Sequence, residues 1–235
     1  MPHMSTAKKE SPRPGVQSLP RALHQEHRGA LDRSVELVVH AGEPDVVLDR
    51  GDRGKTQMKA PQRLETERLV LRKPALADAE EICRRYASDP EVTRYLAWPR
   101  HRTVDDTRAF IQFSDAEWRD YSAGPYLIES GSGLLLGGTG LEFKTKTADQ
   151  AVTGYVLSRD AWGQGYATEA LRAMIEVARE LNTRELLAIC HAQHIPSQRV
   201  LEKCGFSCKG NLLVEFPNLG PGESGDALRY ELVLA

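Results

Sequence analysis

The sequence lacks an excess of charge of either sign and any long apolar run. Its 235 residues include 31 Lys and Arg and 33 Asp and Glu, which leaves a formal net charge of −2. This balance gives no reason to expect a nucleic acid or an anionic membrane as a partner. No segment approaches the roughly 20 uninterrupted apolar residues that a membrane-spanning helix needs. We therefore expect a globular protein with no nucleic-acid partner and no membrane partner.

Cysteines are also few. The chain has four, at Cys83, Cys190, Cys204 and Cys208, and this is too few to indicate a disulfide framework in a domain of this size. The N-terminal segment "MPHMSTAKKESPRPG" is basic but lacks the apolar stretch of a secretory signal. A reducing cytoplasm is the expected location.

The composition changes near residue 60. Residues 1–60 are rich in Pro, Ser, His, Gly and charges of both signs, and only "VELVV" and "DVVLD" are apolar. Such a segment buries too little apolar surface to fold alone. We predict a disordered N-terminal extension over 1–60 and one folded domain over 61–235, whose share of apolar residues is ample for a core.

Strand and helix patterns alternate through the folded domain. The sequence predicts strands over 66–74, 125–129, 133–144, 151–158, 185–192, 206–216 and 226–234, and helices over 76–90, 103–118, 166–181 and 196–205. Thr103 with Asp106 is a variant of the capping box. Pro196 suits a first helical position, and Gly205 suits a helix end. This order of elements is typical of an α+β, or mixed α/β, sheet domain.

Two glycines precede the helix predicted over 166–181, in the stretch "WGQGYATEAL" from Trp162 to Leu171. The first turn of a helix leaves backbone N–H groups without intrahelical partners. Gly163 and Gly165 carry no Cβ, so a ligand can contact these peptide groups directly. With the positive end of the helix dipole, the turn is suited to bind a phosphate or a diphosphate.

The glycine-rich segments allow other interpretations. The turn at 163–165 could simply connect a strand to a helix. A dinucleotide fingerprint needs a third glycine where Thr168 stands, and it needs an early βαβ unit. The segment "DRGDRGKT" resembles a P-loop, but Asp49 replaces its first glycine and Pro61 would cut short the following helix. A zinc site built from His191, His194 and two cysteines has loose spacing, so we expect no metal.

Two blocks carry a family resemblance. The run "GYVLSRDAWGQGYATEALRAM", followed by "CHAQHIPSQRVLEKCGF", resembles the GNAT superfamily of N-acetyltransferases, and in particular the branch named for the ribosomal-protein acetyltransferases RimJ and RimL. The resemblance extends from about Gln62 to the C-terminus. It implies a central, mostly antiparallel, twisted sheet of six to seven strands that is splayed in the middle and flanked by about four helices.

The resemblance also implies which residues hold acetyl-coenzyme A. In this superfamily the glycine-rich turn binds the diphosphate through backbone amides, which would here belong to Gly163, Gln164, Gly165, Tyr166, Ala167 and Thr168. The strand before the turn splays from its neighbour. Its free backbone groups at Tyr155, Val156 and Leu157 would pair with the pantetheine arm and reach the thioester carbonyl.

The catalytic residues are implied less directly. His194 stands where the family has Asn, and Ser197 keeps a serine that the branch places near the coenzyme sulfur, so we expect both residues to contact the coenzyme as well. Ser197 could stabilise or protonate the leaving thiolate, and it could equally cap the helix. Close relatives often read "AETGY" where this chain reads "AVTGY", so Val152 replaces a possible base. Glu142 is the first replacement we consider, and Glu129 or a water relay are others.

The predicted activity is transfer of an acetyl group from acetyl-coenzyme A to a primary amine, either a protein N-terminus or a small molecule. The amine would attack directly, without a covalent enzyme intermediate, in a monomer or a homodimer. Tyr95, Trp98 and Trp118 would line the acceptor cleft or pack in the core. Two alternatives stay open: a catalytically weak acyl-coenzyme A sensor, which Val152 and His194 favour, and a nucleotide-binding protein that uses the same turn.

Overall fold

The computed structural model describes residues 58–144 and 148–234. Residues 1–57 of the expected N-terminal extension lie outside the described residues. The described chain enters the fold directly, because Ala60 is buried and its N–H donates to Ser122 O at 2.8 Å.

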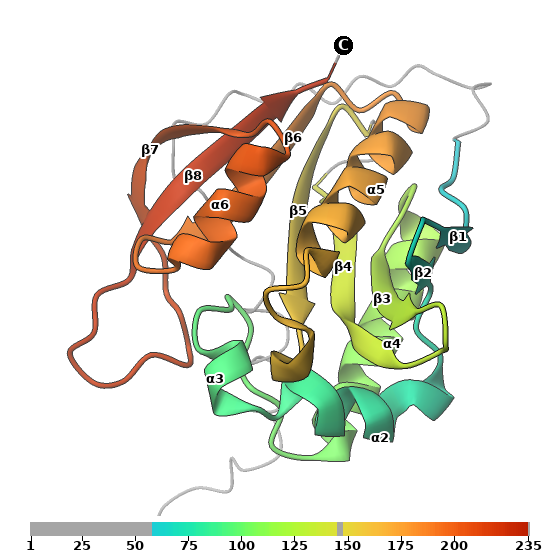
Figure 1. Cartoon of the computed structure of the whole chain (residues 1–235), viewed down its shortest axis with the longest axis horizontal. Helices are drawn as coiled ribbons and strands as arrows, with labels where there is room; N and C mark the ends of the chain where they lie inside the picture. Colours follow the sequence, from blue (N-terminus) through green and yellow to red (C-terminus); the bar gives the residue numbers. More distant parts are fainter. Residues whose placement is uncertain (1–57, 145–147, 235) are drawn as a thin grey trace, which may run out of the picture. The chain divides into compact units, whose positions relative to one another are not determined.

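The core of the fold is one eight-stranded sheet in the order β1-β2-β3-β4-β5-β6-β8-β7 (Figure 1). Neighbouring strands are antiparallel except for the parallel pair β5 and β6. The strands are β1 (Arg63–Glu65), β2 (Leu69–Arg72), β3 (Pro125–Ser130), β4 (Leu135–Phe143), β5 (Gln150–Leu157), β6 (Glu185–His191), β7 (Ser207–Leu213) and β8 (Asp226–Val233). The sheet has one strand more than the six to seven expected, because the three residues of β1 are too few to show a periodic pattern.

In the part of the chain that the structure describes, five α-helices flank the sheet, where about four were expected: α2 (Ala79–Ile82), α3 (Pro90–Thr93), α4 (Val104–Asp120), α5 (Tyr166–Glu180) and α6 (Ile195–Lys203). The helix predicted over 76–90 is not continuous. A π-helical turn, Cys83–Ala87, follows α2, and the Asp89 side chain caps a new helix that begins at Pro90. The capping box of Thr103 and Asp106 is confirmed at the start of α4.

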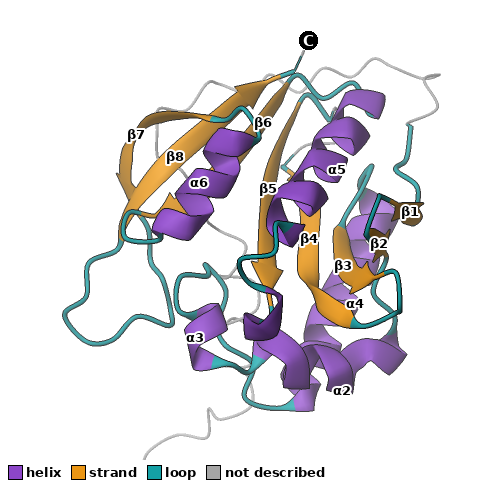
Figure 2. Ribbon diagram, in the orientation of Figure 1, coloured by secondary structure: helices purple, strands orange, loops and turns teal. Residues whose placement is uncertain are grey.

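The helices cover opposite faces of the sheet (Figures 1 and 2). On one face, buried Leu171, Met174 and Ala178 of α5 pack in the main core cluster. On the other face, a second cluster joins α2 and α4 to Leu127 and partly buried Val156. We call these the α5–α6 face and the α2–α4 face. Because side chains alternate along a strand, each residue of β5 and of β4 from Gly137 onward, beyond the bulge in its pairing with β3, can be assigned to one of them.

The sheet is splayed between β5 and β6, as expected. These strands pair only from Gln150–Val152 to Glu185–Leu187. Beyond Val152, β5 continues its pairing with β4 as far as Leu157, and β6 continues its pairing with β8 as far as His191. The two strands therefore diverge toward their C-terminal ends, which lead into the glycines at 163 and 165 and into α6.

Candidate functional site

The segment Gly163–Thr168, which consists of the turn before α5 and the first three residues of that helix, is where the sequence predicts an anion site. We call it the glycine turn. Gly163 has φ +73° and Gly165 φ +82°, both in the left-handed region that favours glycine. Gly165 is the N-cap and offers no side-chain cap, and the first helical bond runs from Glu169 N–H to Gly165 O at 3.1 Å. The amides of Tyr166, Ala167 and Thr168 thus precede the helical ladder and can serve a ligand.

The strand that leads into this turn presents backbone groups to the splay. Ser158 N–H donates to Leu136 O of β4 at 2.8 Å, so by strand alternation Tyr155 and Leu157 face β6 and Val156 faces β4. Of the three residues expected to contact the pantetheine arm, Val156 is the exception, because its backbone N–H and carbonyl point toward its β4 partner Gly138 and away from the gap. The Leu157 carbonyl accepts the Trp162 indole N–H at 2.8 Å. This leaves both groups of Tyr155 and the N–H of Leu157 directed toward the gap.

Ser197 meets the side chain of Tyr155 across the splay. The Tyr155 hydroxyl donates to Ser197 O at 3.0 Å and lies 3.0 Å from Ser197 Oγ. Burial raises the pKa of the Tyr155 phenol above its usual range. Ser197 lies inside the first turn of α6, whose N-cap is His194. Its hydroxyl therefore contacts Tyr155 on the α5–α6 face, and the helix-capping alternative gains no support.

His194 belongs to an aromatic stack at the C-terminal end of β6. Its ring centroid lies 5.1 Å from that of Tyr95, which stacks on His191 at 4.6 Å. Burial and the neighbouring His191 lower the pKa of His194, so its imidazole is neutral at pH 7. Both ring nitrogens of His191 are engaged, by Ser224 O at 2.9 Å and by Gln193 N–H at 3.1 Å. In residues 58–144 and 148–234, no group of three or more His, Cys, Asp or Glu side chains is placed to hold a metal ion.

The candidate bases lie on the other face of the sheet. Tyr155 reaches α6, so Val152 and the residue directly opposite it, Glu142, face α2 and α4. Glu142 forms an ion pair with Lys144 at 2.5 Å. Glu129 is held by Arg72 at 2.6 Å and lies on β3. Glu142 is thus the nearer replacement for the carboxylate that Val152 lacks.

A further carboxylate, which the sequence analysis missed, belongs to α4. Burial, together with the charges of Glu142 and Asp120, raises the pKa of Glu117 to about 7, and Lys144 opposes this shift. Glu117 is half-buried beside the inner stripe of α4, which includes Ser114 and Trp118. The sequence signal for Glu117 was its place in the helical period, next to the buried positions Ser114 and Trp118. Gly154, on the same face, is exposed, and a Cβ placed on it would meet nothing within 4 Å.

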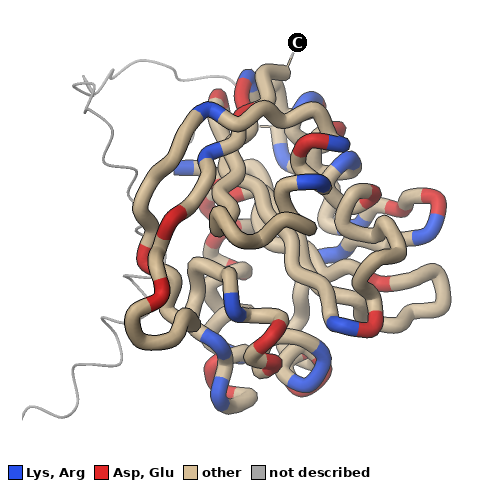
Figure 3. The backbone as a smooth tube through the Cα atoms, turned by 60° about the vertical axis from the view of Figure 1, so that its left-hand side comes forward, with Lys and Arg blue, Asp and Glu red and all other residues tan. Residues whose placement is uncertain are grey.

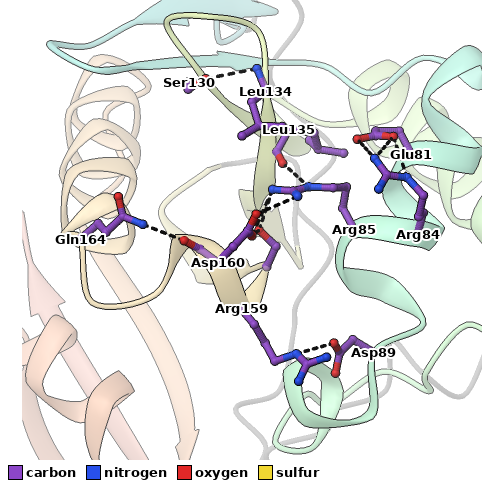
Figure 4. A network of polar contacts seen from close by, with 11 residues as sticks. Glu81, Arg84, Arg85, Asp89, Ser130, Leu134, Leu135, Arg159, Asp160 and Gln164 are labelled. Atoms are coloured by element: carbon purple, nitrogen blue, oxygen red, sulfur yellow. Dashed lines mark hydrogen bonds and ion pairs between the residues drawn. The ribbon is translucent and has the colours of Figure 1, made fainter.

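A polar network holds the segment just before the glycine turn (Figure 4). Arg85, from the π-helical turn, donates to Asp160 at 2.8 and 3.1 Å and to Leu135 O at 2.8 Å. The Gln164 amide donates to Asp160 O at 2.7 Å. Gln164, one of the expected cofactor residues, thus uses its side chain to fix the turn, and its peptide N–H can serve a ligand.

Arg68 also reaches the glycine turn, and the sequence analysis missed it. Its Nη1 donates to Gln164 O at 3.0 Å, and its Nε pairs with Glu169 at 2.7 Å. The sequence predicts Arg68 in a strand over 66–74, whereas residues 66–68 form the turn between β1 and β2, so this contact was not expected.

The three aromatic residues proposed for an acceptor cleft lie in different environments. Trp118 is buried, and its indole N–H donates to Pro125 O at 2.9 Å. Trp98 is partly buried against the cluster of α2 and α4, and Tyr95 stacks on the histidines. Trp118 is therefore a core residue, whereas Tyr95 and Trp98 lie in the segment after α3.

Charges of both signs are interspersed along the described chain (Figure 3). The described helices include none that is both long and apolar enough to cross a membrane.

Comparison with known proteins agrees with this geometry. A family model described as an acetyltransferase (GNAT) domain matches residues 68–207, more than half of the chain. A curated relative, the uncharacterized N-acetyltransferase p20 of Bacillus licheniformis, is 32% identical over 151 residues, which cover 63% of this chain and 84% of that protein.

Solved structures agree as well. A GNAT-family acetyltransferase from Bacillus anthracis is 25% identical, with a TM-score of 0.62, and covers 73% of this chain and 98% of its own. RimL, a ribosomal L7/L12 α-N-protein acetyltransferase solved with coenzyme A, has a TM-score of 0.64 at 22% identity, with 72% of this chain and 96% of its own covered. The likeness to RimL is one of fold. The resemblance to the GNAT superfamily is confirmed, and the chain belongs to the GNAT acetyltransferase family.

Proposed function

We propose that this acetyltransferase moves the acetyl group of acetyl-coenzyme A to a primary amine by direct attack in a ternary complex. The observation that carries the proposal is that the uncapped glycine turn and the splay lie at the same end of β5. A diphosphate bound at the turn would direct the pantetheine arm along the gap-facing groups of Tyr155 and Leu157. The RimL structure, which contains coenzyme A, supports this choice of donor.

The two reactants would approach from opposite faces. Ser197 and Tyr155 meet on the α5–α6 face, while Glu142, Val152 and the exposed Gly154 belong to the α2–α4 face. The thioester would lie in the gap between them. An amine entering over Gly154 would find the carboxylates of Glu142 and Glu117 on its own side, and these would attract its cation and accept its proton.

Ser197 would stabilise the leaving thiolate through a short chain of hydroxyls. The Tyr155 phenol has one hydrogen and the Ser197 carbonyl can only accept, so in the ligand-free geometry the Ser197 hydroxyl donates to Tyr155. If Tyr155 turns its hydrogen to Ser197 Oγ, the serine hydrogen is free for the sulfur. A serine hydroxyl is too weak an acid to protonate a thiolate fully, so the role is stabilisation by a hydrogen bond.

The acceptor is a primary amine of a protein N-terminus or of a small molecule. RimL is named for acting on ribosomal protein L7/L12, which favours a protein N-terminus as the first acceptor to test. All four cysteines are free thiols, which fits the reducing cytoplasm that we propose as the location.

A second candidate function is an acyl-coenzyme A sensor with weak or no turnover. The absence of a carboxylate at Val152 and the ion pair between Glu142 and Lys144 favour it. The nucleotide-binding alternative has no comparable support.

One paired experiment separates these functions. Calorimetry with acetyl-coenzyme A measures donor binding, and release of the free thiol measures turnover across a panel of N-terminal peptides and small amines. The proposal expects binding together with thiol release that depends on at least one amine. Binding with no release on any amine would favour the sensor. Heat stabilisation by ATP or NAD and none by coenzyme A would overturn both.

A further inference from the structure

Arg68 places a guanidinium group at the glycine turn from a distant part of the chain. It lies in the turn between β1 and β2, and its side chain is 44% exposed. Its Cζ stands 4.7 Å from the ring centroid of Tyr166. A Cβ built on Gly165 would lie 3.4 Å from Arg68 Nη2. The arginine therefore borders the same peptide groups that offer their amides to a ligand.

The contacts of Arg68 leave one of its nitrogens available. Nε pairs with Glu169 at 2.7 Å and Nη1 donates to Gln164 O at 3.0 Å. Nη2 has no acceptor among the residues that the structure describes, and it lies beside Gly165. Two contacts thus fix the plane of the guanidinium, and its third nitrogen stays directed to the side of the turn.

Glu169 explains why a cation is needed here. It is an acidic residue in the first turn of α5, where its carboxylate would repel a second anion. Burial favours its neutral form, but hydrogen bonds from Thr66 at 2.6 Å and from Arg68 hold the pKa of Glu169 below its ordinary value. The carboxylate is therefore ionised, and Arg68 and Thr66 occupy its oxygens.

We propose that Arg68 binds the diphosphate of coenzyme A opposite the glycine-turn amides, and so makes the enzyme prefer coenzyme A to acyl donors that lack a diphosphate. This inference rests on the proposed donor. A guanidinium is suited to the role because its planar donors match phosphate oxygens and it stays charged at any physiological pH. It also neutralises Glu169, which would otherwise weaken the positive end of the helix.

The alternative is a purely structural pair in which Arg68 braces Glu169 and the Gln164 peptide. That role would affect every donor equally, because the pantetheine arm depends on the same turn and strand. A shortened donor separates the two roles, because S-acetylpantetheine carries the same thioester as acetyl-coenzyme A but has no diphosphate for Arg68 to bind.

The test compares Arg68→Ala with the unaltered enzyme. Calorimetry gives the Kd of coenzyme A, and kcat/KM is measured for acetyl-coenzyme A and for S-acetylpantetheine. We expect the Kd of coenzyme A to rise at least tenfold and kcat/KM with acetyl-coenzyme A to fall by a similar factor. The kcat/KM with S-acetylpantetheine should change less than twofold. Added salt should weaken coenzyme A binding less in the variant than in the unaltered enzyme.

Arg63→Ala is the matched control. Arg63 lies on β1, is 56% exposed and pairs with Glu65 in the same hairpin, so it should leave both donors unaffected. Arg68→Gln is the second variant, because it keeps a donor for Gln164 O and removes the charge. Equal losses with both donors, or an unchanged Kd for coenzyme A in both variants, would overturn the inference. An unaltered protein that binds no coenzyme A would instead overturn the proposed function.

Discussion

Replacement of Gly165 by Ala tests whether the glycine turn is both strained for other residues and in contact with the donor. Gly165 has φ +82°, and an L-residue in that region costs about 1–2 kcal/mol. Alanine also lowers the conformational entropy of the unfolded chain, which offsets about 0.4–1 kcal/mol of this cost. The expected net loss is roughly 1 kcal/mol in the free energy of unfolding, or ~2–4 °C in Tm for a chain of this size.

The same variant should weaken donor binding. In the free protein the new methyl group would meet only Arg68 Nη2, at 3.4 Å, so it has room. With a diphosphate bound to the peptide groups, the methyl would occupy space that the ligand needs. We expect the Kd of coenzyme A to rise about tenfold, which is ~1.4 kcal/mol, as measured by calorimetry alongside thermal unfolding.

Two other glycines provide matched controls. Gly133, in the turn between β3 and β4, has the same φ of +82° and open space around it, so Gly133→Ala should lose the same stability and keep its coenzyme A affinity. Gly131 also has open space and no positive φ, so its replacement should cost little. If Gly133→Ala weakened coenzyme A binding as much as Gly165→Ala, the contact between the turn and the diphosphate would be refuted.

Three further predictions concern the reaction and the fold. Tyr155→Phe and Ser197→Ala should each lower kcat by about tenfold, which corresponds to the loss of one polarised hydrogen bond, and should change the KM for acetyl-coenzyme A little. The kcat of the double variant should be hardly lower than that of either single variant. Additive losses in kcat would contradict a shared hydroxyl chain. The rate should rise with pH through about 7 as Glu117 ionises, and Glu142→Gln should move this inflection to lower pH, because it removes a like charge. An unmoved inflection would assign it to the amine itself. Thr103→Ala should cost about 1 kcal/mol of stability in denaturant titrations, since it removes the cap of α4, and it should leave kcat unchanged.

The parts of the site that the sequence predicted are those whose chemistry is local. Gly163 and Gly165 follow a strand and precede an amphipathic helix, and this order alone predicts exposed amides. Thr103 and Asp106 show a cap within four residues. The missed parts are contacts between distant residues. Arg68 and Glu169 are 101 residues apart, and Tyr155 and Ser197 are 42 apart, so no periodic pattern joins them.

The position of Tyr95 and Trp98, two of the residues that the sequence proposed for an acceptor cleft, also depends on contacts between distant residues. Asn218, between β7 and β8, donates to Thr93 O and Trp98 O at 2.8 Å each, and it accepts the Arg100 N–H at 2.8 Å. Arg94 pairs with Glu223 across the same two segments. The donor site that we propose consists mostly of the backbone of one continuous segment, which a resemblance can locate. The segment that holds Tyr95 and Trp98 is instead positioned by side chains more than 100 residues away in the sequence, and no motif indicates this in advance.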